Sequence, residues 1–308
     1  MKRTFHLCLS SDNEVMFRDE EDYIRGFNTF ALALYKTDST GLVESFMTNH
    51  VHMLVQTADP DKFMGAYRMP YTKYFNYKYA RSGSLGEPRH FTLEIKGLHH
   101  HLAAMSYVLR NALHHGVAPI PYAYPHSSVN AIFQKEMGKR PERELLLPAS
   151  YYRYIGRRAE FPQTYKMNKS GLFLRESVLD IPQVENMFST PRKFDFYMNR
   201  KSTEEWLAEQ SKDQENLAPI TLDLIESDIH LNTTKQMIFN EGGIGDYRRV
   251  SDVEVCEEID KVLTQELKKP SVYVWTREEK LAAAKYLRTR FNIGESQLYR
   301  CLAMGYSK

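Results

Sequence analysis

Cysteine is scarce in this 308-residue chain, and its three residues, Cys8, Cys256 and Cys301, are far apart and odd in number. This spacing gives no disulfide framework and no paired-cysteine zinc site, and it favours a reducing compartment. Long apolar runs are also missing: none approaches the ~20 residues of a membrane span. The apolar stretch after Lys2-Arg3 is too short for a signal peptide. We therefore expect a cytoplasmic protein with no membrane partner.

Glycine clusters only once, at Asn240–Gly245, and no Lys-Ser/Thr pair follows it, so a phosphate-binding loop is not indicated. We interpret the cluster as a flexible joint. It divides a helical extension, predicted for 136–239 and broken by several prolines, from a small module predicted for 240–308. The remaining residues, 1–135, form the predicted first domain.

Positive charge exceeds negative charge only slightly, with a formal net charge of +2, but the charged residues are unevenly distributed along the chain. Residues 61–116 carry eight Lys/Arg against three Asp/Glu, a net charge of +5. Residues 202–228 carry one Lys against eight acids, a net charge of −7, and residues 276–308 return to +4. Two basic regions on either side of an acidic one indicate two anion-binding surfaces.

Hydrophobic periodicity in the first domain predicts four strands and three helices. The expected elements are strands at 4–9, 41–47, 50–56 and 90–95, and helices at 20–35, 60–79 and 98–114. Asp59-Pro60 is a typical helix start, because a proline in the first turn loses no hydrogen bond there. The order β-α-β-β-α-β-α predicts an α+β fold, an antiparallel sheet with helices on one face.

The C-terminal module has the pattern of a helix-turn-helix. Thr276-Arg277-Glu278-Glu279 is a capping box for a helix that continues to Arg290. A turn at 292–294 leads to a second helix at 295–303, and we expect Gln297, Tyr299 and Arg300 to point outward from it. With its positive charge, the module is predicted to bind duplex DNA; a plain helical hairpin is the alternative.

Two histidines, His50 and His52, alternate on the predicted strand 50–56 and so share one face of the sheet. They are spaced to share one metal ion, although histidines on a half-buried strand are often structural. Imidazoles suit Mn²⁺ or Zn²⁺, whereas oxygen ligands suit Mg²⁺. His100 and His114, on the helix at 98–114, are alternative ligands.

Tyr107 and Asn111 lie four residues apart and share a face of that same helix. The Asn111 amide would add an oxygen ligand to the metal. Tyr107 would be the nucleophile, provided that a cation or base favours its phenolate, because a free phenol has a pKa near ~10. Core packing is the alternative role for this tyrosine.

The helix at 60–79 mixes cations with aromatic rings, a combination that single-stranded nucleic acid favours. The alternative is that its tyrosines pack on the sheet. The candidate DNA-binding residues in and just after this helix are Arg68, Tyr71, Lys73, Tyr74, Lys78 and Arg81.

As a set, these motifs resemble the HUH single-tyrosine transposases, and most closely the REP-associated tyrosine transposases. The matching segments are 47–55, 63–81, the stretch Tyr107-Val108-Leu109-Arg110-Asn111, and the exit Tyr124-Pro125-His126-Ser127-Ser128. The resemblance covers about residues 1–135. The chain departs from the family at Asn111-Ala112, where Asn-Pro is common, and at 83–89, where an expected aromatic is missing.

The resemblance implies a ferredoxin-like core, the HUH domain, with Mg²⁺ or Mn²⁺ held by His50 and His52. It implies Tyr107 as the covalent nucleophile, Asn111 as third ligand, and a DNA-binding role for Arg110. The substrate would be hairpin-bearing single-stranded DNA, nicked and rejoined through a 5′-phosphotyrosine by a monomer or homodimer, which would be nucleoid-associated when bound. Two alternatives stay open: a domesticated repeat-binding protein that no longer cuts, and a replication-initiator or relaxase-type nickase.

Overall fold

The computed structural model describes residues 1–305 except 141, 143, 200–202, 214–216, 227–228, 230, 234 and 240–244. Most of the joint predicted at Asn240–Gly245 therefore lies outside the described residues. Among the described helices, none is long and apolar enough to cross a membrane.

An antiparallel four-stranded sheet in the order β2-β3-β1-β4 forms the centre of the molecule. Its strands and the three helices between and after them agree with the sequence prediction to within a few residues: β1 Arg3–Ser10, α1 Glu20–Lys36, β2 Thr40–Phe46, β3 His50–Thr57, α2 Pro60–Lys78, β4 Phe91–Ile95 and α3 Leu98–His114. The predicted α+β class is confirmed. Local chemistry sets the helix starts, because Asp19 and Asp59 each cap a helix through a side-chain oxygen.

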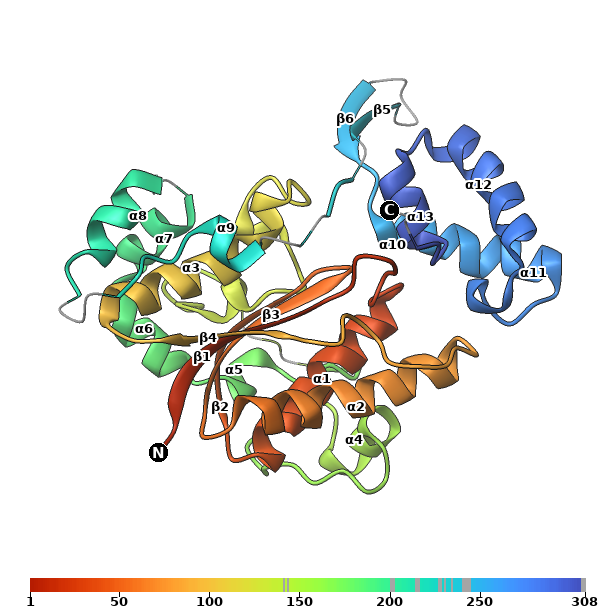
Figure 1. Cartoon of the computed structure of the whole chain (residues 1–308). Helices are drawn as coiled ribbons and strands as arrows, with labels where there is room; N and C mark the ends of the chain where they lie inside the picture. Colours follow the sequence, from red (N-terminus) through yellow and green to blue (C-terminus); the bar gives the residue numbers. More distant parts are fainter. Residues whose placement is uncertain are drawn as a thin grey trace.

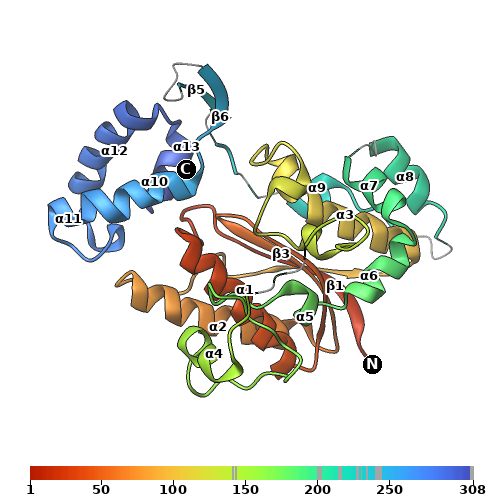
Figure 2. The same cartoon turned by 180° about the vertical axis from the view of Figure 1, so that it is seen from behind.

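Helices cover both faces of this sheet (Figures 1 and 2), so the expectation of helices on one face is wrong. Phe46 on β2 contacts Phe30 of α1 and Tyr67 of α2, whereas His52 on β3 contacts Tyr107 of α3. The reason is that α3 follows the last strand and crosses to the face that α1 and α2 leave uncovered. The side chains on β3, a central strand, are consequently buried, except for the half-buried Gln56.

The segment 136–239, predicted as a helical extension, contains short helices that pack into the same core as the sheet. Its described helices are α4 Pro148–Ile155, α5 Arg175–Val178, α6 Ile181–Phe188, α7 Pro191–Asn199, α8 Thr203–Gln210 and α9 Leu222–Glu226. Buried side chains such as Val184 and Phe194 belong to one cluster with β1–β4. Helices α6, α7 and α8 contact α3 and so thicken the layer above the histidines.

The C-terminal part has a second hydrophobic cluster, made by residues 250–302 together with Val15 from the first domain. The described elements of this C-terminal part are a short hairpin and the helices that follow it: β5 Lys235–Phe239, β6 Gly245–Arg249, α10 Asp252–Glu258, α11 Thr264–Leu267, α12 Arg277–Phe291 and α13 Glu295–Cys301. A π-helical stretch at Ile259–Leu263 joins α10 to α11. The capping box at Thr276 and Glu279 is present as predicted. A DNA-binding role for α12 and α13 stays a prediction.

The outward orientation expected for Gln297 and Arg300 is wrong, because both side chains are buried. Gln297 donates to the Val250 carbonyl at 2.7 Å. Arg300 forms a two-pronged ion pair with buried Asp252 at 2.8 and 2.9 Å, and Asp252 also accepts a hydrogen bond from Thr48 at 2.7 Å. The inner face of α13 therefore fastens the module to the turn between β2 and β3.

A second arginine ties the loop between β1 and α1 to the same module. The Arg18 side chain is fully buried and binds Asp260 at 2.8 and 3.0 Å. Its third contact is a hydrogen bond of 3.0 Å to the Cys301 carbonyl. The C-terminal module is thus fixed to the sheet by paired charges as well as by apolar packing.

We expect Arg300→Met to lower the free energy of unfolding by about 3–5 kcal/mol, since it leaves the Asp252 carboxylate buried without its partner. Chemical denaturation of the full chain measures this change. Lys285→Met, on the exposed side of α12, is the matched control and should change stability by less than about 0.5 kcal/mol. Equal midpoints for the two variants would contradict the role assigned to Arg300.

Candidate functional site

The two predicted histidine ligands lie side by side on β3, facing α3. Both side chains are fully buried, and their ring centroids are 5.0 Å apart. Because β3 pairs with β2 on one side and β1 on the other, its backbone is fixed along its whole length. The period of two along the strand thus gives the pair that the sequence predicts.

Helix α3 brings Tyr107 and Asn111 to these histidines. The Tyr107 ring lies 5.3 Å from the His52 ring, edge to face. The Asn111 amide donates to the Tyr107 hydroxyl at 3.3 Å, and its Oδ1 is 2.9 Å from His50 Nε2. The structure therefore brings together all four residues for which the sequence predicts a catalytic or metal-binding role.

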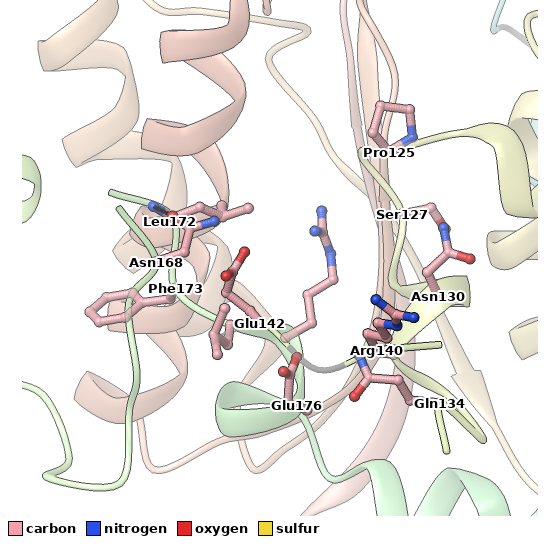
Figure 3. A pocket seen from close by; sticks show the side chains of 13 residues that line it. Pro125, Ser127, Asn130, Gln134, Arg140, Glu142, Asn168, Leu172, Phe173 and Glu176 are labelled. Atoms are coloured by element: carbon pink, nitrogen blue, oxygen red, sulfur yellow. Dashed lines mark hydrogen bonds between the residues drawn. The ribbon is translucent and has the colours of Figure 1, made fainter. Parts of the chain in front are cut away.

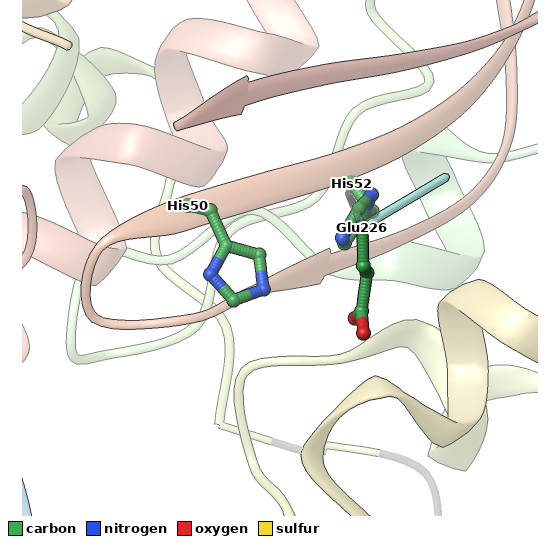
Figure 4. A group of neighbouring side chains, drawn as sticks. All are labelled: His50, His52 and Glu226. Carbon is green, nitrogen blue, oxygen red and sulfur yellow. The ribbon is translucent and has the colours of Figure 1, made fainter. Parts of the chain in front are cut away.

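A fifth residue, Glu226 at the end of α9, completes the cluster (Figure 4). Ligand atoms of His50, His52 and Glu226 all lie within 4.8 Å of one another. Glu226 Oε1 accepts a hydrogen bond from the Asn111 amide at 3.0 Å and lies 3.0 Å from His115 Nε2. The sequence analysis missed this residue, whose one signal is its place in the acidic segment 202–228.

Burial and neighbouring charges set the protonation of these groups. Burial lowers the pKa of His50 to about 3 and lowers the pKa of His52 well below its ordinary value. Burial opposes ionisation of Glu226, but hydrogen bonding and the charge of His115 outweigh it and lower the pKa of Glu226 to about 2. At neutral pH the cluster consists of two neutral imidazoles and one carboxylate, the protonation state that metal binding requires.

The surroundings of Tyr107 disfavour loss of its proton. Burial, followed by the nearby Glu226 carboxylate, raises the pKa of Tyr107 well above its ordinary value. Its side chain is 2% exposed. The phenol is therefore protonated in this arrangement, and a positive charge is needed nearby before it can act as a nucleophile.

The orientation of the Asn111 amide shows where a cation fits. Its Nδ2 donates to Glu226, so its Oδ1 must face His50. An unprotonated Nε2 would then place two lone pairs opposite each other at 2.9 Å. The neutral ring carries one proton: on Nε2 it is donated to Oδ1, whereas on Nδ1 it leaves Nε2 and Oδ1 positioned to bind one metal ion.

His52 provides a second sign of a metal. Its Nε2 is buried and has no hydrogen-bond partner among the described residues, an arrangement that costs about 1–3 kcal/mol. Imidazole nitrogen with carboxylate and amide oxygen is a donor set that fits Mn²⁺, and Mg²⁺ through its oxygens. The residues present thus fit a divalent ion.

The two alternative histidine ligands have different surroundings. The His114 ring stacks on Tyr107 with centroids 5.6 Å apart, and burial lowers its pKa to about 4. His100 instead lies at the start of α3, where its Nδ1 is 2.6 Å from Asp213. His114 therefore borders the site, and His100 does not belong to it.

Most of the cations predicted to bind DNA on or near α2 have partners within the protein. Arg68 donates to carbonyls of the 85–88 loop, Lys78 binds Asp19 and Asp22, and Arg81 binds Glu14. These contacts hold the loops on either side of the helix. Their DNA-binding role stays a prediction. It would require these side chains to leave their partners within the protein and bind DNA phosphates instead.

The predicted tyrosines and the remaining cations differ in exposure. Tyr71 is buried and donates to the Met16 carbonyl at 2.7 Å, and Tyr74 donates to Asp22 at 2.9 Å. Lys73 is exposed. Arg110, on α3, donates to the Tyr197 carbonyl at 3.2 Å and lies over the Trp206 ring. Lys73 is thus the member of the predicted set that faces solvent most openly.

A separate pocket of about 340 Å³ lies at the β2 edge of the sheet (Figure 3). Ser127, Asn130, Arg140 and Glu176 are among its lining residues. None of the residues that line this pocket belongs to the histidine cluster. It is therefore distinct from the candidate site.

No protein-family model matches the chain, and no curated protein matches it. A solved structure described as "Structure of the REP associates tyrosine transposase bound to a REP hairpin" is similar over 46% of this chain and 84% of that chain, with a TM-score of 0.39 and 13% sequence identity.

Proposed function

We propose that this protein is a metal-dependent DNA strand transferase, a transposase-type enzyme that nicks single-stranded DNA through Tyr107. One observation carries the proposal: the Asn111 amide donates to the tyrosine hydroxyl and to the Glu226 carboxylate, and it places its oxygen 2.9 Å from buried His50. A plain structural core has no need of an unpaired imidazole nitrogen beside a tyrosine. The choice of hairpin-bearing DNA as substrate follows the resemblance of the sequence motifs.

The chemistry follows from this arrangement. The Tyr107 oxygen attacks a backbone phosphorus, the bond from phosphorus to the 3′ oxygen breaks, the phenol loses its proton and the 3′ oxygen gains one. A divalent ion held by His50, His52 and Glu226, with Asn111 beside them, would polarise the phosphate and offset the charge of the phenolate. Because the phosphotyrosine keeps the ester, the strand can be rejoined to another end without ATP.

One observation favours a second candidate, a DNA-binding protein that does not cut. Tyr107 is 2% exposed, and the Glu226 carboxylate lies beside its hydroxyl and accepts from the neighbouring Asn111. A phosphate can reach the buried hydroxyl only if the side chains around it move. Binding without cutting would result if they do not.

Covalent trapping decides between these candidates. The full chain is mixed with labelled single-stranded hairpins from its own genomic flank and Mn²⁺ or Mg²⁺, and then run on a denaturing gel. An adduct that disappears with chelator supports the transferase. Tight hairpin binding without an adduct supports the non-cutting protein.

The role of Glu226 as third ligand gives a separate prediction. We expect Glu226→Ala to weaken Mn²⁺ binding by more than the roughly 10–100-fold that loss of an outer-shell partner costs, and to lower the adduct yield. Asp223→Ala, an exposed acid on the same short helix, is the matched control. More adduct from Glu226→Ala with unchanged Mn²⁺ affinity would instead assign Glu226 to covering Tyr107.

A further inference from the structure

Each imidazole ligand must present a lone pair to the ion and carry its single proton on the other nitrogen. The hydrogen bond of that other nitrogen decides which tautomer forms. The residues that set the tautomers of His50 and His52 can therefore be found from hydrogen-bond directions, given the metal centre of the proposed function.

Asn49 sets the tautomer of His50. Its Nδ2 donates to the Ser11 carbonyl at 3.2 Å, and a carbonyl can only accept, so the orientation of the amide is fixed. Its Oδ1 then lies 2.8 Å from His50 Nδ1. Nε2 also faces an amide oxygen, that of Asn111, so an ion shared by these two atoms requires the proton on Nδ1, where the Asn49 oxygen accepts it.

His6 is the corresponding hydrogen-bond acceptor for His52. It lies on β1, next to β3 in the sheet, and its Nε2 is 3.0 Å from His52 Nδ1. Both rings are fully buried. If His52 donates from Nδ1 to His6, its Nε2, which none of the described residues hydrogen-bonds, keeps a lone pair directed into the cluster. The reverse direction would place a proton on the nitrogen that the ion needs.

We propose that His6 and Asn49 are positioning residues, which hold both imidazoles with the proton on Nδ1 and turn each Nε2 toward the ion. We assign neither residue as a ligand of the ion. Each acts through the histidine that it contacts. His6 comes from a different strand, 44 positions before His50, so no local motif contains the set.

Paired variants test the proposal. His6→Met removes the acceptor at similar volume, whereas His6→Gln keeps an amide oxygen at the reach of Nε2. Asn49→Leu removes the acceptor to His50, and Asn49→Asp keeps it. Mn²⁺ affinity of the full, DNA-free chain is measured from the electron paramagnetic resonance signal of free Mn²⁺, and melting in chelator checks the fold.

We expect His6→Met and Asn49→Leu to weaken Mn²⁺ binding by about 10–100-fold, and the conservative partners to stay within about threefold of wild type. Wild-type affinity in both acceptor-free variants would overturn the proposal. Should His6→Met fail to fold, the Asn49 pair decides.

His52→Ala separates failure of this inference from failure of the proposed function. If His52→Ala binds Mn²⁺ as wild type does, the metal centre itself is wrong. If His52→Ala loses Mn²⁺ while His6→Met and Asn49→Leu keep it, the metal centre stands and the positioning roles fail.

Discussion

Tyr107→Phe is expected to abolish the covalent protein–DNA adduct while Mn²⁺ binding and the fold are kept. The substitution removes one oxygen and leaves the ring between His52 and His114 in place. Loss of a nucleophile costs on the order of 10⁴–10⁶-fold in rate in enzymes that form covalent intermediates. Denaturing gels with labelled hairpin DNA measure the adduct, and Mn²⁺ titration of the same sample measures the metal site.

Tyr67→Phe is the matched control for this experiment. Tyr67 is also buried, and its hydroxyl has no hydrogen-bond partner among the described residues, so losing that oxygen should leave the adduct unchanged. If an adduct of wild-type yield forms in Tyr107→Phe, another residue is the nucleophile and the proposed role of Tyr107 is lost.

His52→Leu is expected to lose both Mn²⁺ binding and adduct formation without loss of stability in chelator. The imidazole has a buried Nε2 with no hydrogen-bond partner in the described part of the chain, and its burial costs about 1–3 kcal/mol in the absence of metal. Leucine removes that nitrogen and fills much of the same space, but it also removes the hydrogen bond between His52 Nδ1 and His6 Nε2, so the gain and the loss offset each other. If the variant is at least as stable as wild type in chelator, His52 is not needed for folding, and its role is functional.

Thermal and chemical unfolding with chelator, compared with the same measurements in Mn²⁺, check this prediction. Wild type should gain stability from Mn²⁺ by mass action, and His52→Leu should gain none. His101→Leu, which changes a histidine bonded to the Gly97 carbonyl on α3, should keep the Mn²⁺ response. A Mn²⁺ response in His52→Leu equal to wild type would remove His52 from the ligand set.

The parts of the site that sequence could predict are those set by local periodicity. His50 and His52 follow the period of a strand, and Tyr107 and Asn111 follow the period of a helix, so one element fixes each pair. Glu226 could not be predicted, because 115 residues separate it from Asn111 and only the packing of the extension on α3 brings them together.

Two expectations failed for the same physical reason. Arg300 was expected to face solvent because it is charged, but an arginine can be buried when a carboxylate is placed to receive it, and Asp252 is. The expectation of helices on one face neglected α3, whose position depends on contacts with β2 and β3 rather than on its own sequence. Long-range partners decided both outcomes.

The contacts between Arg18 and the C-terminal module have a consequence for folding during synthesis on the ribosome. Arg18 reaches its partners, Asp260 and the Cys301 carbonyl, only after nearly the whole chain has been made. At roughly 5–20 residues per second, that delay is about 15–60 s. Throughout it, the loop after β1 and the turn that leads into His50 lack the contacts that fix them in the finished molecule. A nascent or prematurely ended chain would therefore carry the histidines and the tyrosine before Arg18 and Thr48 have met their partners in the C-terminal module.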